Sequence, residues 1–241
     1  MHILRAAILI SFLSAFPALA AGNNPKPGQW TLMDYLAQKK SVSLMDQWLG
    51  LNTSKVKLLE FYLGGGPVNY NMKTDNGTVT TKTSKHSLKY HAALYVSFIG
   101  LEADYENTNE ETESYSGALG IRLLGLSNQS TNLTAKYGLR QLTDSSTDPQ
   151  GLWKNQFAEG ALTLYIVSFM GLQGNYRHYF PDTSSDGTDL RGSKATAGLF
   201  FDLGLLRIFG EYFQEKMEYV KTGVTTTKQR DGLEYGARLY F

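Results

Sequence analysis

Residues 86–98, with the sequence HSLKYHAALYVSF, alternate between apolar and polar side chains at every second position. After the first, the even-numbered positions are apolar: Leu88, Tyr90, Ala92, Leu94, Val96 and Phe98. The odd-numbered positions are mostly polar and include Ser87, Lys89, His91 and Ser97. A β-strand places successive side chains on opposite faces, so this segment is predicted to be a strand with one apolar and one polar face.

The same alternation returns along the chain from about residue 55. We expect about ten strands, at 56–72, 85–98, 101–107, 114–125, 131–143, 153–169, 172–180, 193–203, 206–219 and 229–241. Pro67, which follows three glycines, predicts a bulge or bend in the first strand because proline cannot donate to a strand ladder.

The connections between these strands alternate in length. Long polar connections are expected at 74–83, 107–113, 144–151, 181–192 and 221–228, and tight turns at 99–100, 125–130, 170–171 and 204–205. One long loop followed by one short turn is typical of a membrane barrel with extracellular loops and periplasmic turns. The predicted fold class is therefore all-β: a transmembrane antiparallel up-and-down β-barrel of about ten strands.

Charged residues fall on the polar faces of the predicted strands in balanced numbers. A soluble sandwich would bury them in its core, at a cost on the order of several kcal/mol for each unpaired ion. A membrane barrel instead faces lipid on the outside and has a polar interior. We therefore expect the lumen to be lined by Lys89, Glu102, Asp104, Arg122, Lys136, Arg140, Glu159, Arg177, Asp202, Arg207, Glu211, Glu234 and Arg238.

Residues 1–20 have the three-part pattern of a secretory signal peptide. Arg5 supplies the positive charge, residues 6–16 are apolar apart from two serines, and Ala18 and Ala20 are the small residues that a signal peptidase reads. Cleavage before Ala21 would lower the basic residues from 23 to 22, equal to the 22 acidic ones, which argues against a nucleic-acid partner. The sequence has no cysteine, so neither a lipoprotein anchor nor a disulfide framework is expected.

Residues 21–54 are expected to form a short helical segment between the signal peptide and a barrel that spans 55–241. Two similar stretches, 31–36 and 43–49, each begin with Thr or Ser and carry an acid three residues later, which is the capping pattern of a helix start. Two short amphipathic helices could plug the lumen, dock under the periplasmic turns or lie on the inner leaflet. A structural cap is favoured over an element that binds a partner.

The end of the chain resembles the C-terminal assembly signal of Gram-negative outer-membrane β-barrel proteins. Apolar residues stand at alternate positions before a final phenylalanine: Leu233, Tyr235, Ala237, Leu239 and Phe241. The resemblance implies a location in the cell outer membrane, with membrane lipids and the barrel-assembly machinery as partners. It covers the architecture from about residue 55 onward and matches no single named family. Small barrels of this superfamily include surface proteases and adhesins, so the fold does not choose the function.

The sequence contains no specific catalytic motif. The histidines of the mature chain, His86, His91 and His178, are not in a metal-ligand arrangement such as His-Glu-x-x-His, so we predict no catalytic residue, metal or cofactor. His91 is expected to face the lumen beside Lys89, which would discourage its protonation, and His178 is expected to face lipid.

We therefore expect a structural or surface-interaction role, or a narrow polar pore for small solutes, because about ten strands enclose more room than eight. The alternative is a membrane-embedded hydrolase of the surface-protease or lipid A deacylase type. Its candidate residues would be His178 with Asp182, Asp186 or Asp189. An extracellular or periplasmic protein partner is left open.

The C-terminal pattern generates the first prediction. Deletion of Phe241, or Phe241→Ala, is expected to lower assembly into the outer membrane more than Tyr240→Ala, because Tyr240 has the lumen-facing parity. The measurement is the amount of heat-modifiable protein in the outer-membrane fraction, since a closed barrel resists detergent until it is boiled. Equal assembly of all three variants would contradict the assembly role of Phe241.

Overall fold

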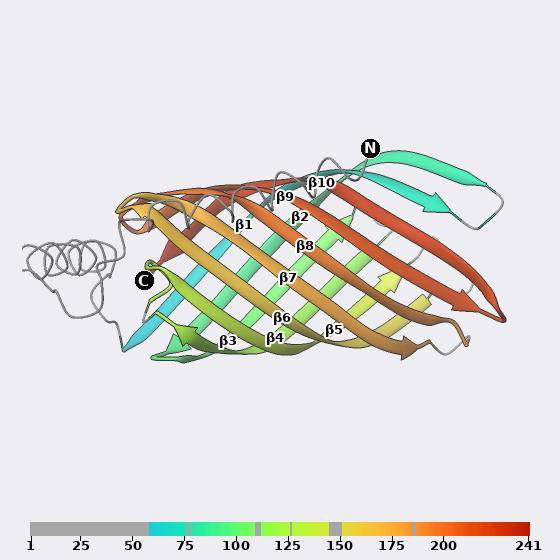
Figure 1. The fold of residues 1–241 in the computed structure, drawn as a ribbon, viewed down its shortest axis with the longest axis horizontal. Helices are drawn as coiled ribbons and strands as arrows, with labels where there is room; N and C mark the ends of the chain where they lie inside the picture. Colours follow the sequence, from blue (N-terminus) through green and yellow to red (C-terminus); the bar gives the residue numbers. More distant parts are fainter. Residues whose placement is uncertain are drawn as a thin grey trace, which may run out of the picture. The chain divides into compact units, whose positions relative to one another are not determined.

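In a computed structural model, the chain forms a closed ring of ten strands (Figure 1). The structure describes residues 58–75, 77, 79–108, 112–125, 127–144, 151–184 and 187–241. The strands are β1 Leu59–Asp75, β2 Thr80–Val96, β3 Ile99–Thr108, β4 Thr112–Leu124, β5 Asn132–Asp144, β6 Gly151–Val167, β7 Met170–Thr183, β8 Asp189–Leu203, β9 Leu206–Lys221 and β10 Val224–Tyr240.

Each strand pairs antiparallel with its neighbour in the sequence, and β1 pairs with β10 to close the ring. The predicted all-β antiparallel barrel of ten strands is thereby confirmed. The predicted signal peptide at 1–20, the segment 21–54 and its two helices lie outside the described residues. None of the described residues belongs to a helix long and apolar enough to cross a membrane.

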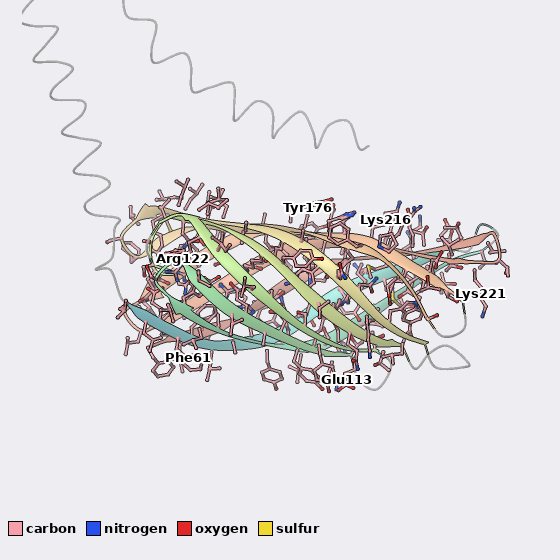
Figure 2. The ribbon with its side chains drawn as sticks, turned by 90° about the horizontal axis from the view of Figure 1, so that it is seen from below. Phe61, Glu113, Arg122, Tyr176, Lys216 and Lys221 are labelled. Atoms are coloured by element: carbon pink, nitrogen blue, oxygen red, sulfur yellow. The ribbon has the colours of Figure 1, made fainter. Side chains whose placement is uncertain are left out.

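The alternation in the sequence decides which face of the wall each side chain takes. On β2, Leu88 and Leu94 are exposed on the outer wall, whereas Ala93 and Tyr95 are buried inside. Figure 2 shows side chains covering the outside of the barrel, with Phe61 among them. A soluble monomer rarely exposes a contiguous apolar surface of this extent, so the outer wall is suited to lipid.

Outward-facing tyrosines mark one edge of the apolar wall: Tyr90, Tyr105, Tyr115, Tyr137, Tyr176, Tyr212 and Tyr235. Tyrosine favours a membrane interface because its ring is apolar and its hydroxyl is polar. The other edge is formed by apolar residues in the tight turns, such as Phe98 and Phe169. The eight residue-to-residue steps from Tyr90 to Phe98 span about 27 Å along the chain and about 20 Å in height, comparable with a lipid band of about 25 Å.

Beyond the tyrosine belt, the strands continue unequally (Figure 1). β3 ends at Thr108, three residues past Tyr105, whereas β2 runs from Tyr90 back to Thr80, about 33 Å along the strand. Membrane barrels have short periplasmic turns and longer extracellular segments, so we assign the long parts of β9, β10, β1 and β2 to the outside of the cell. We call them the extracellular sheet; it comprises residues 213–221, 224–234, 68–75 and 80–89.

The expected long connections at 74–83 and 221–228 are therefore wrong in their bounds. Residues 80–83 belong to β2, and β9 joins β10 through the two-residue turn Thr222-Gly223, with φ of 46° and 81°. The polar composition of these two segments predicts loops because neither segment has the apolar face of a membrane strand. Above the membrane both faces of a sheet meet water, and β-branched threonine is well suited to a strand without an apolar partner.

The interruption predicted at Pro67 appears on one side of β1 only. The pairing with β2 continues through Gly66 and Pro67, whereas the pairing with β10 skips both residues. A Cβ on Gly66 would lie 2.0 Å from the carbonyl oxygen of Tyr235, so β10 approaches β1 here at a distance that only glycine permits.

The orientation of the barrel can be tested with cysteines, since the chain has none of its own. Thr81→Cys, in the extracellular sheet, is expected to react with a membrane-impermeant maleimide on intact cells. Ser168→Cys, in the exposed turn between β6 and β7, is expected to react only after the outer membrane is permeabilised. The reverse labelling pattern would invert the orientation.

Candidate functional site

The lumen is lined by charged side chains from every strand, and the register places all the predicted lumen charges on inward positions. Buried are Glu102, Arg122, Arg140, Glu159, Arg207, Glu211 and Glu234; half-buried are Lys89, Asp104, Lys136, Arg177, Asp202 and Arg238. The structure brings each of them into an ion pair inside the barrel. Charges taken out of water are tolerated when they are paired and hydrogen-bonded in this way.

At the turn end of the lumen, the connection between β4 and β5 folds inward and is held by charged residues. The Ser127 hydroxyl and the Arg122 guanidinium both donate to Glu60, and the Asn128 amide donates to the same carboxylate at 3.0 Å. Arg207, on β9, donates to the carbonyl oxygen of Asn128 at 3.1 Å. The turn is thereby tied to the wall on β1 and on β9, and its buried residues Ser127 and Ser130 occupy part of this end of the lumen.

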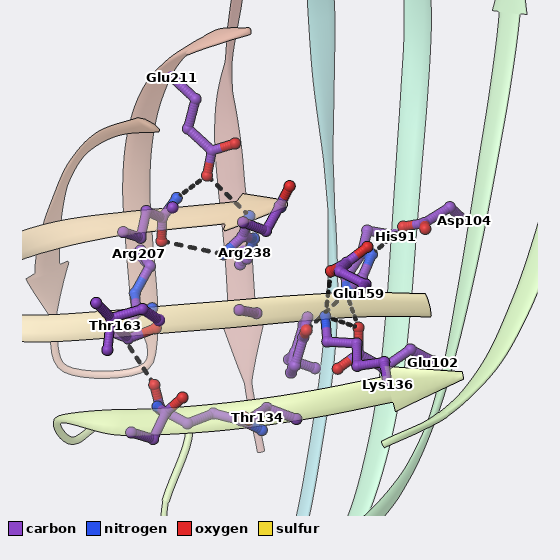
Figure 3. Close-up of a pocket in the computed structure, with 18 of the residues that line it drawn as sticks. His91, Glu102, Asp104, Thr134, Lys136, Glu159, Thr163, Arg207, Glu211 and Arg238 are labelled. Carbon is purple, nitrogen blue, oxygen red and sulfur yellow. Dashed lines mark hydrogen bonds and ion pairs between the residues drawn. The ribbon is translucent and has the colours of Figure 1, made fainter. Parts of the chain in front are cut away.

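A chain of five charged residues crosses the middle of the lumen (Figure 3). The Lys136 ammonium lies 2.6 Å from Glu102 and 2.9 Å from Glu159. The Arg177 guanidinium lies 2.5 Å from Glu159 and 2.9 Å from Asp104. Because these residues come from β3, β5, β6 and β7, the chain fastens distant parts of the wall to one another.

A second set of contacts lies on the side of β9 and β10. Lys89 donates to Glu234 at 2.8 Å, and the Arg238 guanidinium lies 3.6 Å from Glu211. Between this set and the five-residue chain is a cavity of about 100 Å³. That is room for a small number of water molecules, and far less than the roughly 300–1,000 Å³ of common ligand pockets.

His91 takes part in a different arrangement from the one expected. Its Nδ1 contacts Asp104, and its Nε2 lies 2.6 Å from the hydroxyl of Tyr62. The expectation that Lys89 discourages the protonation of His91 stays a prediction; the Lys89 ammonium itself donates to Glu234. The carboxylate–imidazole–phenol order of Asp104, His91 and Tyr62 could pass a proton along the wall.

Sequence reasoning missed several lumen charges in the extracellular half. Arg230 donates to Glu106 and, at 3.0 Å, to Glu215, while the Arg140 guanidinium lies 3.6 Å from Glu215. Lys194 is also buried here and lies over the ring of Phe213. Strand parity carried further along β3, β8, β9 and β10 would have found them, because they share the parity of inward residues already identified.

The extracellular end of the lumen is filled by apolar side chains. Leu142, Trp153, Leu190 and Met217 form one buried cluster, with Tyr219 packed against it. Trp153 donates to the carbonyl oxygen of Thr188 at 3.0 Å, which ties the cluster to the connection between β7 and β8. The lumen is thus obstructed at this end as well.

The described residues that were considered for hydrolysis each have other contacts. His178 is exposed on the outer wall, edge-on to Phe180, while Asp182 accepts a hydrogen bond from the Lys154 amide and Asp189 one from the Thr183 hydroxyl. Asp186 lies outside the described residues. Within the described part of the chain, no three His, Asp or Glu side chains are grouped so that they could hold a metal ion.

The residues of the predicted assembly signal lie along the outer wall of β10. Leu233, Tyr235, Leu239 and Phe241 are exposed there, and Ala237 shares their parity. The Phe241 backbone donates to Phe61 at 2.8 Å, and the two phenylalanine rings lie 5.9 Å apart. Tyr240 is buried in the lumen, as its parity predicts.

A closed antiparallel ring, an apolar outer wall with a tyrosine belt and an interior of paired charges together define an outer-membrane β-barrel protein. Its location is accordingly the cell outer membrane.

The comparison with solved structures gives matches of low sequence identity. The outer membrane protease OmpT from Escherichia coli has 11% identity and a TM-score of 0.43, over 78% of this chain and 98% of that one. Neisserial surface protein A has 13% identity and a TM-score of 0.32, over 75% and 97%. OprG from Pseudomonas aeruginosa has 11% identity and a TM-score of 0.25, over 77% and 97%. No family model and no curated protein matches the sequence.

The buried network generates a stability prediction. Glu159→Gln is expected to lower the free energy of unfolding by about 3–5 kcal/mol, because Lys136 and Arg177 would lose the buried carboxylate that they share. The control is Glu218→Gln, which removes a carboxylate that pairs with Arg191 and Lys216 near water and is expected to cost about 1 kcal/mol or less. Urea unfolding of barrels refolded in lipid vesicles measures both, and equal losses would contradict the structural role of the buried network.

Proposed function

We propose that the protein is a surface-interaction barrel with a closed lumen, anchored in the outer membrane to hold the extracellular sheet above it. The observation that carries this proposal is the unequal length of the strands. β9, β10, β1 and β2 continue past the tyrosine belt, while β3 and β4 end close to it. A barrel that only sealed or stabilised the membrane would have no need for strands that continue so far past the tyrosine belt.

The filled lumen supports the same function over a pore. The described part of the interior contains cavities of about 100, 30 and 50 Å³, separated by ion pairs and capped by side chains at both ends. Opening a path for solutes would require breaking several buried ion pairs, each at a cost on the order of kcal/mol. The narrow polar pore considered from the sequence is therefore the weaker candidate.

The form of the extracellular sheet also fits a binding role. Its strands are paired to their ends: Asp75 lies opposite Thr80 and Thr227, and Lys221 lies opposite Val224. A sheet held by continuous ladders is already ordered before a partner arrives, so little conformational entropy is lost on binding. Its surface is rich in threonine and lysine, which offers hydrogen bonds and positive charge.

A hydrolase is supported by one observation only, the order of Asp104, His91 and Tyr62. These side chains border the cavity of about 100 Å³, which has no room for a peptide or a lipid. We therefore propose that the protein is not an enzyme and that the arrangement stabilises the wall.

Conductance distinguishes the closed barrel from the pore. Purified full-length protein in planar bilayers is expected to give no discrete current steps, because buried ion pairs lie between the small cavities of the described lumen. A heat-modified band from the same preparation would show that folded barrel was present. Regular steps of constant size would contradict the closed lumen and favour the pore.

A further inference from the structure

One edge of the extracellular sheet has no neighbouring strand among the described residues. β2 pairs with β1 over its whole length, from Thr80 opposite Asp75 to Val96 opposite Leu59. Its pairing with β3 begins only at Leu88, opposite Asn107. On the β3 side, residues 80–87 therefore have no partner strand within the part of the chain that the structure describes. We call these residues the β2 edge.

The backbone direction along the β2 edge follows from the register. The Ser97 amide donates to the Leu58 carbonyl at 2.9 Å, so odd-numbered residues of this strand direct their backbone groups to β1. Even-numbered residues direct theirs to the other side. Thr80, Lys82, Ser84 and His86 thus present N–H and C=O groups to the open side of the β2 edge.

These backbone groups are accessible. Residues 80–84 are exposed on both faces of the strand, and His86 is exposed as well. A row of free N–H and C=O groups on a strand edge is a template to which an extended segment can add as a further strand. Residues 80–87 provide the length of an ordinary strand, which is about five or six residues.

Charge indicates the kind of segment that fits. The β2 edge has Lys82, Lys85 and His86 and contains no acid. Lys82 lies directly opposite Lys73 of β1, and both side chains have the outward parity. Like charges at opposite positions of an antiparallel pair repel each other, and neither lysine forms an ion pair with a described carboxylate. An acid brought beside Lys82 would relieve this repulsion.

We propose that the β2 edge binds an extended, acidic segment of a partner protein, which adds as a strand beside β2 with its acids next to Lys82. This proposal rests on the surface-interaction role and specifies the partner's chemistry. A second copy of the chain fits less well, because antiparallel pairing of two β2 edges would place the lysines of one copy near those of the other. The backbone ladder supplies the affinity, and the lysine pair selects the charge.

The test uses full-length protein in lipid nanodiscs and three fluorescent eight-residue peptides, followed by anisotropy. One peptide alternates valine and glutamate. The second replaces glutamate with lysine, and the third is the glutamate peptide with every second backbone amide methylated. Only the first is expected to bind saturably, because the second has the wrong charge and the third lacks the donors of the ladder.

Substitutions in the β2 edge complete the test. Ser84→Pro removes an amide that faces the open side and keeps the ladder to β1, so it is expected to weaken binding of the glutamate peptide about tenfold or more. Lys82→Glu is expected to weaken it to a similar degree, about tenfold, through like-charge repulsion. The matched control is Lys216→Glu on β9, a strand that is paired on both sides, with an expected change of about twofold or less. All variants should remain heat-modifiable.

Three results would overturn the proposal: no saturable binding of the glutamate peptide at about 1 mM, equal binding of the lysine peptide, or no effect of Ser84→Pro. A dimer of the wild type that Ser84→Pro dissociates would assign the β2 edge to a second copy instead. The result of the peptide-binding test does not depend on whether the barrel conducts in planar bilayers. A closed barrel that binds none of the peptides would leave the surface role in place and reject the β2 edge as its site.

Discussion

The constraint on which the structure depends is that lipid offers no hydrogen bonds to a peptide backbone. Every N–H and C=O group at membrane depth must pair within the protein, and a sheet meets this demand only when it closes on itself. Here the closure is the pairing of β1 with β10, from Tyr62 opposite Tyr240 to Asp75 opposite Thr227. Phe241 extends this seam through its backbone bonds to Phe61. The C-terminal residues thus lie at the place where the ring is completed.

Closure has a consequence for the interior. The apolar side chains of each strand face outward, so the alternate side chains face the lumen. Many of these inward side chains are charged. The chain from Glu102 through Lys136, Glu159 and Arg177 to Asp104 pairs these charges across four strands. The interior of this barrel is therefore a core held by ion pairs. The apolar cluster around Trp153 lies at its extracellular end, and the inward-folded β4–β5 turn lies at the opposite end.

The backbone pairing that closes the ring also builds the extracellular sheet. Above the membrane, water can satisfy an unpaired amide, so β2 continues past Leu88 with no neighbour on the β3 side among the residues that the structure describes. In lipid, such an edge would be forbidden; in water its backbone groups can hydrogen-bond to solvent or to an added strand. The change of solvent along one strand thus separates the part of the protein that anchors from the part that we propose binds.

The sequence by itself determined the all-β barrel class, a count of about ten strands and the facing of the named wall residues, because side-chain alternation is a local property that a strand translates directly into inside and outside. Lumen residues such as Arg177 could be assigned for the same reason. Only the tertiary structure decided which charges meet, that His91 contacts Asp104 and Tyr62, and that the lumen is filled, since these contacts join strands whose register no local pattern records. It also turned residues 80–83 from loop into strand. A strand has an apolar face in its sequence only where it packs against lipid or a core. Residues 80–83 lie above the membrane, where the hydrogen-bond ladder to β1 holds them in place.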